Sequence, residues 1–248
     1  MKTKSIILAA AIAAALVPAA NAALVWTGGS NALYREANWL DNDGNVPTAG
    51  TIDAGIPVTA ATGGLIEITS GTGTPNGFGG GSFTLGVGND LTVGGGKILQ
   101  SSGSDGLRVL SGGNPANSAV GLVGASTIYV QFILDLDVSL DEGSILHLKG
   151  GGNPVNLSTI DIQDTASMIL FDAETWSAFQ SEHIKKVTYR GAALEFGSYP
   201  YTVEPGDNAL ATAYNGTSGV QIQAVPEPSS ALMPLGLLAL GALLRRRK

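Results

Sequence analysis

The chain of 248 residues has room for one or two domains, and its 35 glycines are about twice the usual ~7%. It has no cysteine, which excludes disulfides, Cys-ligated metals and cysteine nucleophiles, and its two histidines, His147 and His183, leave few ligands for a histidine-based centre. Residues 23–244 hold seven basic and all 20 acidic residues, a net charge of −13, which argues against a nucleic-acid-binding surface.

The N-terminus predicts a secretory signal peptide, residues 1–22. Two lysines precede an apolar run, residues 6–17, which is too short for a bilayer that needs ~20 residues. Small side chains follow at Ala20 and Ala22. We therefore expect signal peptidase to cleave after Ala22 and to leave Ala23 as the mature N-terminus. A buried N-terminal helix is the alternative.

The mature chain opens on a tryptophan pattern. Trp26-Thr27-Gly28-Gly29 is followed by Asn38-Trp39, and this opening resembles that of exported autotransporter-associated β-strand repeat proteins. The resemblance implies a parallel β-helix in which Trp26 and Trp39 cap the core. The alternative is a sugar-binding role, in which exposed aromatic rings form the platform of a carbohydrate-binding module. The candidates for that platform are Trp39, Tyr129, Tyr199 and Tyr201.

Residues 23–224 predict one extracytoplasmic β domain. Short runs that alternate apolar and polar residues are separated by Gly, Asn, Asp, Ser and Pro, which is the pattern of half-buried strands joined by turns. The expected strands are residues 65–68, 83–85, 91–93, 107–110, 127–136, 145–148, 160–162 and 168–171.

An internal repeat suggests how these strands are arranged. Leu107–Asn117 matches Leu146–Asn156 at an offset of 39 residues, and a fainter copy begins at Leu65. Each copy is a strand, a glycine-rich corner and a proline. Such units predict an all-β fold, a right-handed parallel β-helix or solenoid with ~20-residue rungs, two per repeat. A β-sandwich built from hairpins is the alternative.

A short helix and a set of closing strands are expected next. Asp172 can cap a helix in which Trp176, Phe179, Ile184 and Val187 recur near helical spacing. Antiparallel strands are then expected at residues 186–189, 193–196, 199–203, 209–214 and 220–222.

The acidic residues offer two weak candidates for chemistry. Residues 41–45, Asp-Asn-Asp-Gly-Asn, suggest calcium but depart from the EF-hand spacing, so a tight turn is the preferred interpretation. Asp135 and Asp137 are two apart in an expected strand, followed by Asp141 and Glu142, and paired carboxylates would suit a hydrolase. We interpret them as an acidic solvated face. We predict no catalytic residue, no cofactor and no metal site.

The C-terminus predicts a membrane anchor. An apolar stretch of 14 residues, 231–244, is somewhat shorter than the ~20 residues of a typical transmembrane helix. The basic end fixes its orientation by the positive-inside rule. The anchor leucines are Leu232, Leu235, Leu237, Leu238, Leu240, Leu243 and Leu244, and the cytoplasmic basic stop is Arg245, Arg246, Arg247 and Lys248.

The tripeptide before this helix makes the tail more specific. Pro226, Glu227 and Pro228 precede the apolar stretch, and the whole segment 225–248 resembles the PEP-CTERM sorting signal of Gram-negative bacteria. The resemblance implies that a membrane protease of the exosortase type recognises and removes the tail, after which the protein reaches the cell surface or an extracellular polysaccharide matrix. Prolines keep the motif extended and accessible.

Together these patterns predict a non-enzymatic, exported structural protein of the cell surface or extracellular matrix. Its expected partners are signal peptidase, an exosortase-type protease, the membrane at least transiently, and exopolysaccharide as a candidate ligand. A carbohydrate-binding surface module is the alternative function, and a polysaccharide lyase or hydrolase is the less favoured one.

Overall fold

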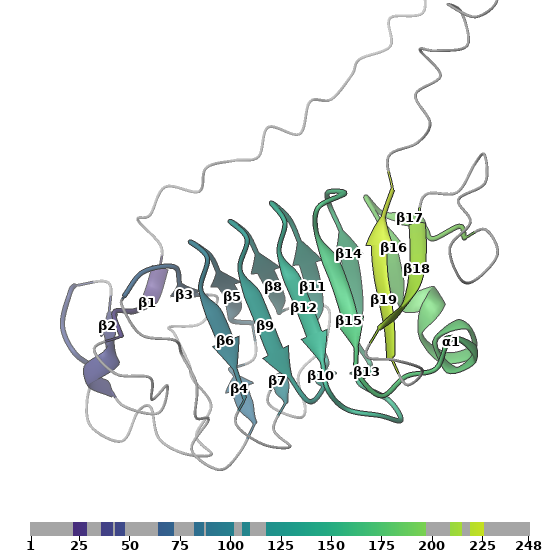
Figure 1. Ribbon diagram of the computed structural model, residues 1–248. Helices are drawn as coiled ribbons and strands as arrows, with labels where there is room; N and C mark the ends of the chain where they lie inside the picture. Colours follow the sequence, from purple (N-terminus) through teal and green to yellow (C-terminus); the bar gives the residue numbers. More distant parts are fainter. Residues whose placement is uncertain are drawn as a thin grey trace, which may run out of the picture.

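The structure is a computed structural model that describes residues 22–28, 36–41, 43–47, 64–71, 82–86, 88–101, 106–109, 118–196, 209–214 and 219–225. This part of the chain is mostly β, with one short α-helix. Its strands form three sheets, and within each sheet the strands follow one another along a common axis (Figure 1).

We name the sheets A, B and C and give their strands in spatial order. Sheet A contains β17 (Ala192–Ala193), β16 (Val187–Tyr189), β14 (Thr159–Ile162), β11 (Asp137–Leu140), β8 (Ala119–Leu122), β5 (Asp90–Val93), β3 (Leu65–Ile68), β1 (Ala22–Trp26) and β2 (Trp39–Asp41). Sheet B contains β18 (Ala209–Tyr214), β19 (Gly219–Ala224), β15 (Met168–Phe171), β12 (Ile145–Leu148), β9 (Thr127–Val130) and β6 (Ile98–Gln100). Sheet C contains β13 (Val155–Asn156), β10 (Ile133–Leu134), β7 (Leu107–Val109) and β4 (Phe83–Leu85).

The chain coils through the sheets in a fixed order. From β5 to β15 it passes from A to B to C and back to A, and each strand pairs in parallel with its equivalent in the next turn. Val120 lies opposite Val138, and Val138 lies opposite Ile160, so successive turns are offset by 18 and then 22 residues. The fold is thus a parallel, β-helix-like solenoid, and a sandwich of hairpins does not describe this pairing.

The corners between sheets A and B place glycine where the backbone turns sharply. Three successive corners hold two residues with positive φ, which is costly for most L-residues and free for glycine. Two consecutive residues with positive φ reverse or bend the chain sharply between two strands. The pairs are Gly95–Gly96 (φ 60° and 70°), Gly124–Ala125 (64° and 56°) and Glu142–Gly143 (54° and 75°).

A ladder of buried serines follows these corners. Ser126, Ser144 and Ser167 each precede a strand of sheet B and are fully buried. The Ser126 hydroxyl donates to the Val123 carbonyl and that of Ser144 donates to the Asp141 carbonyl, both at 2.6 Å. The Ser144 amide donates to the Ser167 hydroxyl at 3.0 Å. The ladder therefore satisfies backbone groups that the sharp corner takes out of the sheets.

The core is the apolar interior of the coil, and it is closed at both ends. At the N-terminal end β2 runs antiparallel to β1 and pairs Trp39 with Trp26, and neither side chain is exposed. At the C-terminal end β19 runs antiparallel to β15, and β18 runs antiparallel to β19. A helical segment lies beside them: α1 (Trp176–Ala178), a π-helical turn (Phe179–His183) and a 3₁₀ turn (Ile184–Lys186) (Figure 1).

The end-capping prediction for Trp26 and Trp39 is confirmed, as are most of the expected strands. The 39-residue repeat is not a structural period, because its copies begin in different sheets: Leu65 in A, Leu107 in C and Leu146 in B. The single expected strand over 127–136 is in fact β9 and β10, separated by a corner between sheets B and C.

The prediction that Asp172 caps the helix is wrong. The cap is Thr175, whose extended backbone precedes α1 and whose hydroxyl accepts the Ala178 amide at 3.2 Å. Of the closing strands, residues 187–189, 192–193, 209–214 and 219–224 are present, β16 continues the parallel sheet, and residues 199–203 lie outside the described residues.

Candidate functional site

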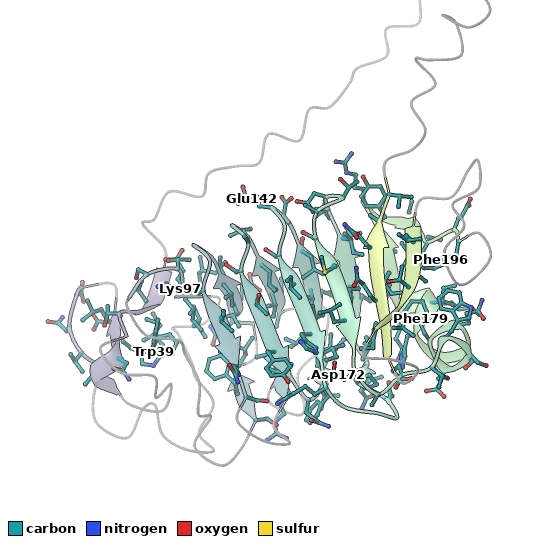
Figure 2. The ribbon with its side chains drawn as sticks, in the orientation of Figure 1. Trp39, Lys97, Glu142, Asp172, Phe179 and Phe196 are labelled. Carbon is teal, nitrogen blue, oxygen red and sulfur yellow. The ribbon has the colours of Figure 1, made fainter. Side chains whose placement is uncertain are left out.

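Both histidines of the chain contact carboxylates of one short segment, residues 172–174, which leaves β15 for the helix. His147 lies on the outer face of β12, and its Nε2 is 2.6 Å from Oδ1 of Asp172 one turn along the solenoid. The side chains are 17% and 23% exposed. The Asp172 amide also donates to the Leu148 carbonyl, which fixes the aspartate beside the strand. Asp172 directly follows β15, and Figure 2 shows it just beyond the end of that strand.

Tyr129 and Lys149 extend this polar group toward the preceding turn. Tyr129 is the register partner of His147, and the two ring centroids are 4.3 Å apart. The Lys149 ammonium lies 4.6 Å from the Tyr129 centroid and donates to the Ser101 carbonyl at 3.1 Å. A cation over an aromatic face is a favourable contact. Because lysine occupies this position, Tyr129 does not offer an open ring for stacking against a sugar.

His183 and Glu174 form a second, buried pair. His183 Nε2 lies 3.7 Å from Glu174 Oε1, and the residues are 0% and 3% exposed. The imidazole stacks on Phe171 at 5.9 Å with an interplanar angle of 7°. The helical segment positions His183, and Phe179 and Phe196 lie at the same end of the solenoid (Figure 2).

This environment shifts both acid–base equilibria. Burial lowers the pKa of His183 below its usual value, and the nearby charge of Lys186 adds to that effect. Burial raises the pKa of Glu174, and the negative charge of Glu182 raises it further. The surroundings of His183 and Glu174 therefore favour the uncharged form of each side chain.

The acidic candidates are not brought together. Asp41 Oδ1 accepts the amides of Asp43 at 2.9 Å and Asn45 at 2.8 Å, so its carboxylate closes a turn. The placement of Asp135 and Asp137 on one strand face is wrong, because Asp135 has φ 58° at the corner before β11. Among the residues that the structure describes, no three His, Asp or Glu side chains are grouped to hold a metal ion.

Several basic side chains satisfy backbone carbonyls. The Lys97, Lys149 and Lys186 ammonium groups donate to the carbonyls of Gly71, Ser101 and Val155. Arg190 Nε donates to the Gln163 carbonyl at 2.9 Å. Between described residues no lysine or arginine forms an ion pair with a carboxylate. These contacts were not foreseen, since a lone lysine in a sequence gives no sign of the carbonyl it will reach.

The aromatic platform fails at Trp39, which packs against the core and is not exposed. Tyr199 and Tyr201 lie outside the described residues. The chemistry that the structure does place on the surface is therefore the group of Tyr129, His147, Lys149 and Asp172, together with the outer faces of the sheets.

The sorting residues were predicted at the two ends of the chain. Ala22 and Ala23 begin β1, whereas Ala20 lies outside the described residues. The motif Pro226–Pro228, the anchor 231–244 and the basic stop 245–248 also lie outside them. The described helical segments include none that is long and apolar enough to cross a bilayer.

Comparison with known proteins found no match to a family model, to a curated protein or to a solved structure.

Proposed function

We propose that the protein is an exported structural protein of the cell surface or extracellular matrix, sorted through Pro226, Glu227 and Pro228. One observation carries the proposal: the first and last described strands lie at the two ends of the interval between the predicted sorting signals. β1 begins at Ala22, where the signal peptide is expected to end, and β19 ends at Ala224, two residues before the motif. This agreement supports a domain over residues 23–224 with a sorting signal at each end.

The construction of the solenoid supports a scaffold role. Its strands hydrogen-bond to their neighbours along the axis, both ends of the core are covered, and several lysines occupy carbonyls that the turns leave open. Backbone held in such ladders opens slowly and is a poor protease substrate. These properties suit a protein that persists outside the cell.

The finer features of the fold belong to the same proposal. We infer that the coil is right-handed, because parallel β–crossover–β connections have that hand in about 98% of cases. The proposal also includes a cleaved N-terminal signal helix and a C-terminal transmembrane helix, 231–244, that an exosortase-type protease removes.

Intact mass spectrometry of the protein from membranes, cell surface and medium tests this function. We expect wild type to lack residues 1–22 and the tail, and Glu227→Ala to retain its tail in the membrane. Ser230→Ala, three residues away in the same segment, is the control and should be processed normally. An intact tail in released wild-type protein, or normal processing of Glu227→Ala, would contradict the proposal.

A further inference from the structure

The outer faces of the solenoid differ sharply in charge. Along sheet A the outward residues include the carboxylates of Glu67, Asp90, Asp137 and Asp161. Across sheet B the outward residues include no carboxylate, lysine or arginine. They form two rows along the axis: Ile98, Thr127, Ile145, Met168, Gln223 and Leu210 in the first, and Gln100, Tyr129, His147, Leu170, Gln221 and Thr212 in the second.

The two rows of sheet B have complementary chemistry. The first is largely apolar, and Ile98 is 41% exposed on it. Apart from Leu170, the second carries amide, phenol, imidazole and hydroxyl groups that both donate and accept hydrogen bonds. Beside this row, Asp172 bonds His147 and the Lys149 ammonium lies over the Tyr129 ring. Sheet B is the sheet that faces the viewer in Figures 1 and 2. A ligand that fits it has an apolar side and a side rich in hydroxyl groups.

The geometry of the rows favours an extended polymer. Neighbouring strands are spaced by ~4.8 Å, so equivalent side chains recur at that interval along the solenoid. This interval is comparable to the advance of one sugar ring along an extended polysaccharide. Pyranose rings also present C–H groups on their faces and hydroxyl groups at their edges.

We propose that the outer face of sheet B binds a neutral, extended polysaccharide that lies along the solenoid axis. The inference rests on the proposed function, since an extracellular matrix supplies the ligand. Charge selects a neutral polymer, because residues 23–224 carry a net charge of −12 and repel anionic chains and second copies of the domain. The strands of sheet B contain no Asp, Glu, Lys or Arg, whereas sheet A presents carboxylates and sheet C presents Arg108.

Affinity electrophoresis of the processed protein tests the face. The gels contain hydroxyethylcellulose or laminarin as neutral probes, or alginate as the anionic probe. We expect the neutral gels to retard wild type and alginate to leave it unaffected. Two variants place a carboxylate on the face: Thr127→Glu, and Gln221→Glu, which keeps the side chain's shape. Each should bind about tenfold or more weakly, because binding would desolvate the new charge.

The matched control is Ala119→Glu, which adds the same charge to the exposed outer face of sheet A in the same turn as Thr127. It should bind as wild type does, and circular dichroism should show all variants folded. Equal weakening in all three variants, no retardation in either neutral gel, or retardation by alginate alone would overturn the inference. So would a dimer of wild type that Gln221→Glu dissociates, because a second copy would then occupy the face.

Fractionation separates this test from that of the proposed function. The purified protein could bind polysaccharide and yet be absent from the surface and matrix fractions. That result would contradict the proposed function and support binding by the outer face of sheet B. Correct sorting without binding would do the reverse.

Discussion

Leu157 occupies an unfavourable position that a single substitution relieves. It stands at the corner between β13 and β14 with φ 49°, and its side chain is 67% exposed. A left-handed backbone costs an L-residue roughly 1–2 kcal/mol, whereas glycine adopts it freely. Exposure of the side chain means that little packing is lost when it is removed. Leu157→Gly should therefore stabilise the fold.

The expected gain is a difference of two terms. Relief of the backbone contributes roughly 1–2 kcal/mol, and the greater freedom of glycine in the unfolded chain offsets about 0.4–1 kcal/mol of it. A net gain near 0.5–1 kcal/mol corresponds to a rise in Tm of about 1–4 °C for a domain of this size. Thermal unfolding followed by circular dichroism measures it.

Two further variants show whether the backbone is the cause. Leu157→Ala removes most of the side chain and keeps the strained φ, so its Tm should stay close to that of wild type. Asp135 occupies the equivalent corner one turn earlier with φ 58°, and Asp135→Gly should gain less because aspartate tolerates this conformation better. Equal stabilisation by alanine and glycine at position 157 would refute the reasoning, since the gain would then come from removing an exposed apolar group.

Two other expectations follow from the site. His183 has a lowered pKa, so as the pH falls below about 6.5 the unfolded state binds the proton first and the folded state loses stability. The advantage of wild type over His183→Phe should therefore shrink between pH 7 and 5, and parallel stability curves would contradict this. The raised pKa of Glu174 has the opposite effect on stability, but Glu174 is present in both proteins. Lys186→Ala removes the ammonium donor of the Val155 carbonyl at the edge of sheet C and should lower the free energy of unfolding in urea by about 1 kcal/mol. Lys185 is exposed and adjacent, so Lys185→Ala should change that free energy little. Equal effects of the two variants would count against the role of the Lys186 contact.

Local patterns predicted the strands well because each strand buries one face. Residues 65–68, 83–85, 145–148 and 168–171 were expected to be strands and are strands with those bounds. Short strands such as β8, which contains Gly121, and the two-residue β13 were missed. In β8 a glycine, typical of turns, interrupts the four-residue pattern, and in β13 two residues are too few to show alternation.

The true repeat was missed because its length varies. From the last inward residue of sheet A to the first of sheet B, the separation is six residues from Val93 to Leu99, from Leu122 to Ile128 and from Leu140 to Leu146. The return through sheet C changes length from turn to turn. The 39-residue repeat therefore matches glycine-rich corners of different sheets and does not follow the turns of the solenoid. Aligning the segments around positions 95, 124 and 143 would have revealed the coil.

The site was less predictable than the fold. Pairing of His147 with Asp172 depends on residues 25 apart that become neighbours only when the coil is known. Burial of His183 depends on the aromatic rings that surround it at the C-terminal end. Neither the His147–Asp172 pairing nor the burial of His183 can be recognised from the residues that adjoin them in the sequence.

The partners of the basic side chains have a consequence for the protein's response to salt. Proteins that rely on surface ion pairs lose those attractions as ions screen them. In the described part of this chain, Lys97, Lys149, Lys186 and Arg190 bond to carbonyl groups. Acidic residues also outnumber basic ones between residues 23 and 224, so the domain carries a net negative charge. Screening therefore removes repulsion and little attraction. Rising ionic strength should therefore stabilise this domain, which would suit the extracellular scaffold proposed above, in surroundings whose salinity the cell does not control.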